Sequence, residues 1–194
     1  TAVLVGMDPY ELLTREAERA PAGSEGLVFL PYLMGERTPH KDANAKGAFV
    51  GLTGRHDRSH MVRAVMEGIT FAMRDSIEIM RGLGLDLQQI RATGGGARSA
   101  LWRQIQADVY GTEVVTINAE EGPAFGAALL AGVGTGMFPD VETACNTLIK
   151  IETRTEPQNE NMNMYSDYYK VFTGLYSALK PSFDQISNLV RSNA

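Results

Sequence analysis

Cysteine is almost absent from this sequence of 194 residues, with Cys145 as its single example. One thiol excludes a disulfide framework and a zinc site built from several cysteines, and it fits a reducing compartment, so we expect a cytoplasmic location. No histidine or basic residue stands near Cys145 to activate it, so we expect it to be unreactive. The three histidines, His40, His56 and His60, lack the spacing of metal ligands, and no metal site is predicted.

Long apolar runs and an excess of positive charge are also missing. No run approaches the roughly 20 apolar residues that cross a bilayer, and residues 1–19 lack the pattern of a signal peptide. The 18 Lys and Arg against 23 Asp and Glu leave a formal net charge of −5, which argues against nucleic-acid binding. We therefore expect neither a membrane nor a nucleic acid as a partner. The chain begins with Thr rather than Met, so we expect it to be a piece of a longer protein.

The composition is that of a folded globular chain. Apolar residues make up 44% and charged residues 21%, which are not the values of a disordered sequence. At the usual length of roughly 100–200 residues per domain, we expect residues 1–194 to form a single domain.

Helix and strand patterns alternate along the chain, which favours an α/β layer fold. Pro181 is expected to break the last helical region or to begin a separate helix over 182–190. The other predicted helices cover 9–19, 59–81, 100–110, 122–133, 140–148 and 161–179, and the predicted strands cover 26–33, 47–52, 89–93, 113–118 and 149–154.

The helix over 59–81 shows an apolar face at helical spacing. We expect this face to be buried and the charged residues of the helix to lie mostly off it. The apolar positions are Met61, Val65, Ile69, Ala72, Met73 and Met80, and the charged ones are Arg63, Glu67, Arg74 and Glu78. Because its neighbours are apolar, Glu67 is expected to be a structural carboxylate paired with Arg37 or Arg63.

Two other groups have a structural interpretation. Tyrosines and a phenylalanine recur at three- and four-residue steps over 165–176, which indicates core packing rather than a platform for stacking a ligand. Glu36, Arg37 and Asp42 together have the chemistry of a catalytic group, but they are expected to brace the loop over 34–46.

The segment Ile90–Ser99 (IRATGGGARS) places three glycines between a predicted strand and the helix over 100–110. Glycine has no Cβ, so such a turn lets the backbone approach a flat or charged ligand closely. The amino end of the following helix offers unpaired N–H groups and the positive end of its dipole, and Ser99 can cap that helix or donate to a ligand. A simple tight turn is the alternative that these residues leave open.

Two common nucleotide-binding signatures are excluded. No Lys-Ser/Thr pair follows the glycines as in a P-loop, and Ser99 stands where a dinucleotide-binding turn needs its third glycine. A later group, Gly132, Gly134 and Gly136, also fails that pattern because Met137 takes the required position. This later group is expected to end the preceding helix.

A second informative segment runs from Gly47 to Glu67. It begins GAFVGL and continues, after a spacer of seven residues, as HMVRAVME. This long, spaced pattern resembles the second signature of the FGGY carbohydrate kinases. The matching positions are Gly47, Phe49, Gly51, Leu52, His60, Ala64, Val65 and Glu67.

Flanking segments similar to the same family extend the resemblance to nearly the whole chain. These are Phe29–Pro39 (FLPYLMGERTP), Thr93–Ile105 (TGGGARSALWRQI), Gly122–Gly132 (GPAFGAALLAG) and Tyr165–Pro181. The first of them looks like the loop of the members that phosphorylate xylulose, and glycerol kinases usually carry a different sequence there. Xylulose is therefore the expected sugar. The alternatives are the family members that act on gluconate, ribulose, glycerol or a signal molecule.

The resemblance implies an α/β fold of the actin-like ATPase (ribonuclease H-like) type, and places the chain in the C-terminal, nucleotide-binding half of a two-domain sugar kinase. The first strands of that half, the sugar site and the catalytic aspartate are expected outside the chain. No catalytic residue and no metal ligand is therefore assigned here, Mg²⁺ would be held mainly with the other half, and the chain alone is expected to be inactive. An open sheet edge would favour self-association, so a homodimer is an expected assembly.

Carried over by motif, the resemblance also implies a pocket for the adenosine of ATP or ADP. Two of the glycines would lie against the adenine, the hydroxyl of Ser99 would reach its edge, and Ala97 with Arg98 would wall the pocket. The implied nucleotide-binding residues are Gly94, Gly95, Gly96, Ala97, Arg98 and Ser99, with Gly122, Pro123 and Phe125 on the opposite side. A non-catalytic domain that keeps the fold without a nucleotide is the alternative, and the glycine triplet argues against it.

Overall fold

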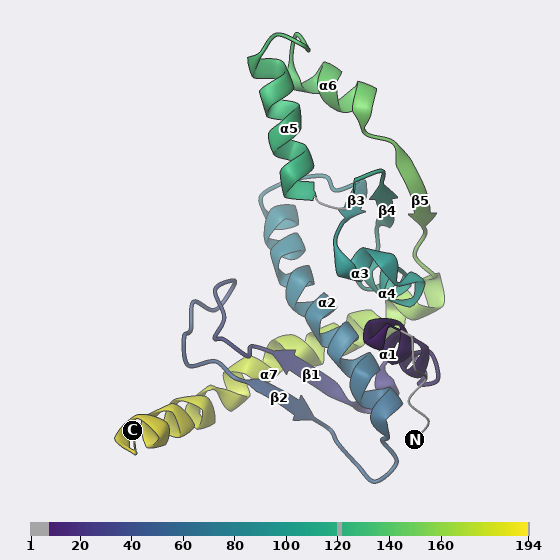
Figure 1. The fold of residues 1–194 in the computed structure, drawn as a ribbon. Coiled ribbons are helices and arrows are strands. Elements are labelled where there is room, and N and C mark those ends of the chain that lie inside the picture. Colours follow the sequence, from purple (N-terminus) through teal and green to yellow (C-terminus); the bar gives the residue numbers. More distant parts are fainter. Residues whose placement is uncertain (1–7, 120–121, 194) are drawn as a thin grey trace.

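The computed structural model describes residues 8–119 and 122–193 (Figure 1). Its helices are α1 (Pro9–Ala17), α2 (Arg58–Gly82), α3 (Gly95–Arg98), α4 (Ala100–Tyr110), α5 (Gly122–Gly134), α6 (Val141–Leu148) and α7 (Asn159–Ser192), with a short turn, η1, at Ser24–Gly26. Its strands are β1 (Val28–Pro31), β2 (Gly47–Val50), β3 (Gln89–Ala92), β4 (Glu113–Ile117) and β5 (Ile151–Thr155). The alternation of helices and strands confirms the predicted α/β class. Within these ranges, none of the helices has both the length and the apolar character to span a bilayer.

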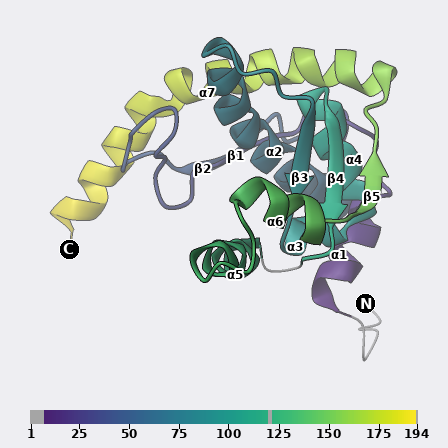
Figure 2. The same ribbon diagram turned by 90° about the horizontal axis from the view of Figure 1, so that it is seen from above.

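The strands form two separate sheets. β1 and β2 make an antiparallel hairpin, whereas β3 runs parallel to β4, and β4 runs antiparallel to β5. Helix α2 runs from the hairpin toward the three-stranded sheet, and α5 with α6 projects beyond it (Figure 1). The view in Figure 2 shows α7 passing along one side of β3, β4 and β5. Within the described residues, β3 pairs with β4 alone and is an edge of its sheet.

A glycine in α2 explains how closely this helix lies against the hairpin. A Cβ built on Gly68 would stand 2.1 Å from the carbonyl oxygen of Phe29 in β1. No side chain fits in that space, so any larger residue would force the helix and the strand apart.

Aromatic side chains fill the core between α2 and α7. Tyr165, Phe172 and Tyr176 on α7 are buried, and Phe71 of α2 packs against Phe172 with ring centroids 5.5 Å apart. The prediction that the residues of 165–176 pack in the core is confirmed for these three positions. Because the two helices share this aromatic layer, burial of apolar surface holds α7 across the molecule.

The predicted buried face of α2 is partly wrong. Met73 is 51% exposed, whereas Arg63 and Glu67, which we expected off that face, are 8% and 3% exposed. The apolar pattern cannot distinguish these cases, since the two charged residues neutralise each other within the core. Their pairing confirms the prediction of Glu67 as a structural carboxylate, with Arg63 rather than Arg37 as its partner.

The expected break at Pro181 is also wrong, because α7 continues without interruption to Ser192. Proline removes one backbone hydrogen bond from a helix, but side-chain contacts around Pro181 hold the helix together. Phe183 is buried, and the ammonium of Lys180 lies 3.0 Å from Asp184. Tertiary contacts thus override the local preference.

Glu36 and Asp42 brace the loop between β1 and β2, as predicted. The carboxylate of Glu36 accepts hydrogen bonds from the backbone N–H groups of Arg37 and Thr38. Asp42 accepts a hydrogen bond from the hydroxyl of Tyr176 at 2.8 Å, and this bond is the main cause that holds the pKa of Asp42 below its ordinary value. The loop is therefore tied to α7.

The most densely bonded group in the core is the carboxylate of Glu67. Its Oε1 accepts from Arg63 Nε at 2.9 Å, from the hydroxyl of Tyr165 at 2.7 Å and from the backbone N–H of Gly23 at 2.9 Å. Its Oε2 accepts from the hydroxyl of Ser24 at 3.0 Å. Burial and the neighbouring carboxylate raise the pKa of Tyr165, so its hydroxyl keeps the proton that it donates.

Two of these bonds fix an unusual turn before β1. Gly23, Ser24, Glu25 and Gly26 have φ values of 79°, 47°, 49° and 94°. Such left-handed conformations cost energy for the two residues with side chains. The bonds from Gly23 and Ser24 to Glu67 offset that cost and join the turn to α2.

We predict that Glu67→Gln destabilises the chain by about 3–5 kcal/mol, because it leaves the buried guanidinium of Arg63 without its counter-charge. Glu78→Gln on the same helix is the matched control, since Glu78 pairs with Arg74 and Arg81 at a half-exposed position and should cost only about 0–1 kcal/mol. Urea denaturation measures both. Equal losses in the two variants would contradict the central role of Glu67.

Candidate nucleotide-binding site

The glycine segment follows directly on the carboxyl end of β3. Gly94 has φ 76° and ψ −164°, a conformation that only glycine adopts readily. The chain then forms the short helix α3, and Ser99 begins α4. We expected the glycines to lead straight into the helix over 100–110, so the separate helix α3 corrects that prediction.

The three glycines have three different surroundings. Gly94 is required by its backbone conformation. A Cβ on Gly95 would meet no described atom within 4 Å, whereas a Cβ on Gly96 would stand 3.3 Å from the ring of Trp102. Gly95 thus presents an open backbone surface, while Gly96 lets the turn rest on the indole ring.

The hydroxyl of Ser99 caps α4. It accepts a hydrogen bond from the backbone N–H of Trp102 at 3.1 Å, so one of the N–H groups that we expected to be unpaired is used within the protein. A hydroxyl that accepts in this way still has its own proton to donate. Both interpretations of Ser99, as a cap and as a donor to a ligand, are therefore compatible with the geometry.

The remaining predicted residues lie on both sides of this turn. Ala97 is buried, and Arg98 is exposed at the end of α3. A Cβ on Gly122 would stand 3.3 Å from the hydroxyl of Thr93, so the start of α5 lies next to the end of β3. Along the first turn of α5, Pro123 is exposed and Phe125 is half-buried.

Trp102 is the residue at this site whose importance the sequence did not reveal. Its indole Nε1 donates a hydrogen bond to the hydroxyl of Thr70 in α2 at 3.0 Å. The regular apolar pattern of the helix over 100–110 gave no sign of this contact. A tryptophan three residues after the capping Ser99 and six residues after Gly96 was the available signal.

The chemistry of the site suits a flat ligand better than a metal ion. The open backbone at Gly95 and the available proton of Ser99 fit a planar base with acceptor atoms at its edge. Across residues 8–119 and 122–193, no group of three or more His, Cys, Asp or Glu residues could hold a metal ion.

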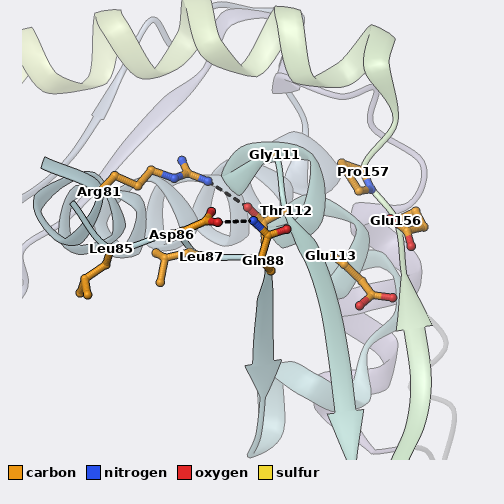
Figure 3. A pocket seen from close by; sticks show the side chains of 10 residues that line it. All are labelled: Arg81, Leu85, Asp86, Leu87, Gln88, Gly111, Thr112, Glu113, Glu156 and Pro157. Carbon is orange, nitrogen blue, oxygen red and sulfur yellow. Dashed lines mark hydrogen bonds between the residues drawn. The ribbon is translucent and has the colours of Figure 1, made fainter. Parts of the chain in front are cut away.

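A hollow of about 700 Å³ lies at the opposite ends of β3 and β4 (Figure 3). Gln88 precedes β3 there, and Thr112 precedes β4. Its polar side chains bond to one another: Arg81 donates to Thr112 at 2.9 Å, and Gln88 donates to Asp86 at 2.6 Å. This hollow is separate from the glycine turn, since none of the residues that line it belongs to Gly94–Ser99.

The fold and the candidate site define the class of the protein: an α/β domain with a glycine turn at the carboxyl end of a strand. Within that class, the chain belongs to the FGGY family of carbohydrate kinases, because residues 5–135 match the sequence model of the C-terminal domain of that family. Its fold is the actin-like ATPase fold of these sugar kinases.

Curated and solved relatives agree with this assignment. The xylulose kinase of Staphylococcus epidermidis is 42% identical over 173 residues, which cover 89% of this chain and 35% of that protein. The gluconokinase of Bacillus licheniformis is 37% identical over 196 residues, which cover 99% of this chain and 37% of that protein. The ligand-bound xylulose kinase of Lactobacillus acidophilus superposes with a TM-score of 0.84 at 32% identity, over 91% of this chain and 36% of that one. The chain therefore spans little more than a third of the length of the relatives it matches.

We predict that Gly94→Ala and Gly95→Ala differ in stability although they are neighbours. The first forces a side chain into a strained conformation and should cost about 1–3 kcal/mol. The second adds a Cβ in open space within a helix and should be neutral or stabilising by up to about 1 kcal/mol. Thermal denaturation compares them, and similar melting temperatures for both variants would show that the turn has a different shape.

Proposed function

We propose that this chain is the nucleotide-binding part of an ATP-dependent carbohydrate kinase. The observation that supports it most is the turn after β3, where the backbone of Gly95 is open and Thr93 lies next to Gly122 at the start of α5. Membership of the FGGY family of carbohydrate kinases also supports the proposal. On this proposal residues 1–194 act as one domain.

The proposed adenosine pocket uses the residues that the family resemblance implied. Gly95 and Gly96 would lie against the adenine, and the proton of the Ser99 hydroxyl would reach an acceptor at its edge. Ala97 and Arg98 would wall one side of the pocket. The other side would be formed by Gly122, next to Thr93, and by the weaker candidates Pro123 and Phe125.

The part of the reaction that this chain performs is to bind and orient the nucleotide. Phosphoryl transfer to a sugar hydroxyl also needs Mg²⁺ and a base near the acceptor. We assign both, together with the sugar site, to the part of such a kinase that this chain does not span. Closure of the two parts would bring the γ-phosphate to the sugar and exclude water.

Xylulose is the sugar that we propose for the whole enzyme, because several relatives, including the one at 42% identity, are named xylulose kinases. Gluconate is the second candidate, since a gluconokinase matches over nearly the whole chain. We also propose a cytoplasmic location, in line with the single cysteine. The edge of β3 that has no partner strand among the described residues is where further strands, or a second copy in a homodimer, would pair.

We predict that the chain binds MgADP and that Gly95→Val weakens this binding by about tenfold or more, because the added side chain occupies the proposed adenine position. Gly174→Val is the matched control: Gly174 lies in α7, and a Cβ there also meets no described atom within 4 Å. Calorimetric titration compares the three proteins. If Gly95→Val bound as tightly as the unsubstituted chain, the pocket assignment would be wrong.

The chain alone is expected to transfer no phosphate. Incubated with MgATP and either xylulose or gluconate, it should form no detectable sugar phosphate, because it lacks the proposed base and sugar site. Formation of ADP and sugar phosphate, assayed with a coupled enzyme system, would place the whole reaction within these 194 residues and refute this division of labour.

A further inference from the structure

The last carbonyls of α3 are held by an arginine from the next helix. Arg103 turns its guanidinium back, and its Nη1 donates to the carbonyl oxygen of Ala97 at 2.5 Å and to that of Arg98 at 3.1 Å. Carbonyl groups at the end of a helix have no partners within it. A helix of four residues is also too short to hold itself. Arg103 therefore supplies bonds that α3 lacks.

Trp102 supports the same turn through a different contact. Its ring lies where a side chain on Gly96 would have to go, and its Nε1 is fixed by the hydroxyl of Thr70. That hydroxyl in turn donates to the carbonyl oxygen of Met66 at 2.7 Å, in the buried interior of α2. The turn thus rests on a ring that is anchored to the longest helix of the first half.

Both side-chain hydrogen bonds found for Arg103 among the described residues go to the end of α3. Its Nε is buried and has no hydrogen-bond partner among the described residues, and within residues 8–119 and 122–193 we find no carboxylate paired with it. Buried polar groups normally find partners. Here one donor is left unpaired while another makes two bonds to the carbonyls at the end of α3.

We propose that Arg103 and Trp102 are positioning residues, which hold the segment Gly94–Ser99 in its ligand-binding conformation before a nucleotide arrives. This inference rests on the proposed function. Neither residue needs to touch the nucleotide, since both act through the backbone of the turn. A preformed turn loses less conformational entropy on binding, so the affinity for nucleotide should depend on these contacts.

Three variants test the proposal in the full 194-residue chain. Arg103→Met removes both bonds to α3, Arg103→Lys keeps a donor that can reach one carbonyl, and Arg191→Met is the control. Arg191 also bonds to a helix carbonyl, that of Ser187, but at the C-terminal end of α7, far from α3 (Figure 1). Trp102 is the single tryptophan of the sequence, so its fluorescence reports directly on the turn.

Titration with MgADP, monitored by Trp102 fluorescence, measures the Kd of each protein. We expect the Kd to be about tenfold higher in Arg103→Met and about threefold higher in Arg103→Lys than in the unsubstituted chain. The control should stay within about twofold. Without nucleotide, acrylamide should quench Trp102 more strongly in Arg103→Met, because the turn no longer covers the ring. A residue that served stability alone would lower the melting temperature and leave the Kd and the quenching unchanged.

The outcomes separate this inference from the function on which it rests. If the unsubstituted chain binds MgADP and Arg103→Met binds it equally well, with unchanged quenching, the positioning role is overturned and the proposed function stands. If the unsubstituted chain shows no response to MgADP, both are overturned. If Arg103→Met does not fold, the Kd of Arg103→Lys tests the positioning role instead. A Kd of Arg103→Lys equal to that of the unsubstituted chain then overturns that role.

Discussion

The buried carboxylate of Glu67 is the group on which much of the structure depends. It joins three segments that are distant in sequence: α2, which carries it, the left-handed turn at Gly23–Gly26, and α7 through Tyr165. Taking a charge out of water is costly unless it is paired and fully bonded. The ion pair with Arg63 and the three further donors meet that requirement. The position of α2 is fixed as a result.

The same helix supports the candidate site. Thr70 lies one turn beyond Glu67, and its hydroxyl links Met66 of α2 to Trp102 of α4. Trp102 in turn lies under Gly96. The helix that carries Glu67 is therefore joined to the glycine turn through Thr70 and Trp102, and the shape of that turn depends on how α2 is packed.

Most elements of this fold could be predicted from the sequence, because capping residues, glycines and β-branched runs mark their ends. The bounds of α4 and the position of the glycine turn after β3 are examples. The burial of Arg63 could not be predicted, since an apolar pattern cannot show that two charges neutralise each other inside a core. The continuity of α7 through Pro181 and the separate helix α3 depend on the burial of Phe183 and on the bonds from Arg103, which the local sequence pattern does not show. At the candidate site, the residue types of the turn were visible in sequence, but its supports from the following helix were not.

Hydrogen exchange with and without MgADP is the measurement that tests the central claim most directly, because it maps where the nucleotide binds along the whole chain. The account predicts slower exchange over residues 93–103 and at the start of α5, and no change around Arg81, Gln88 and Thr112 at the other end of the strands. Protection of that second region, with the glycine turn unaffected, would contradict it.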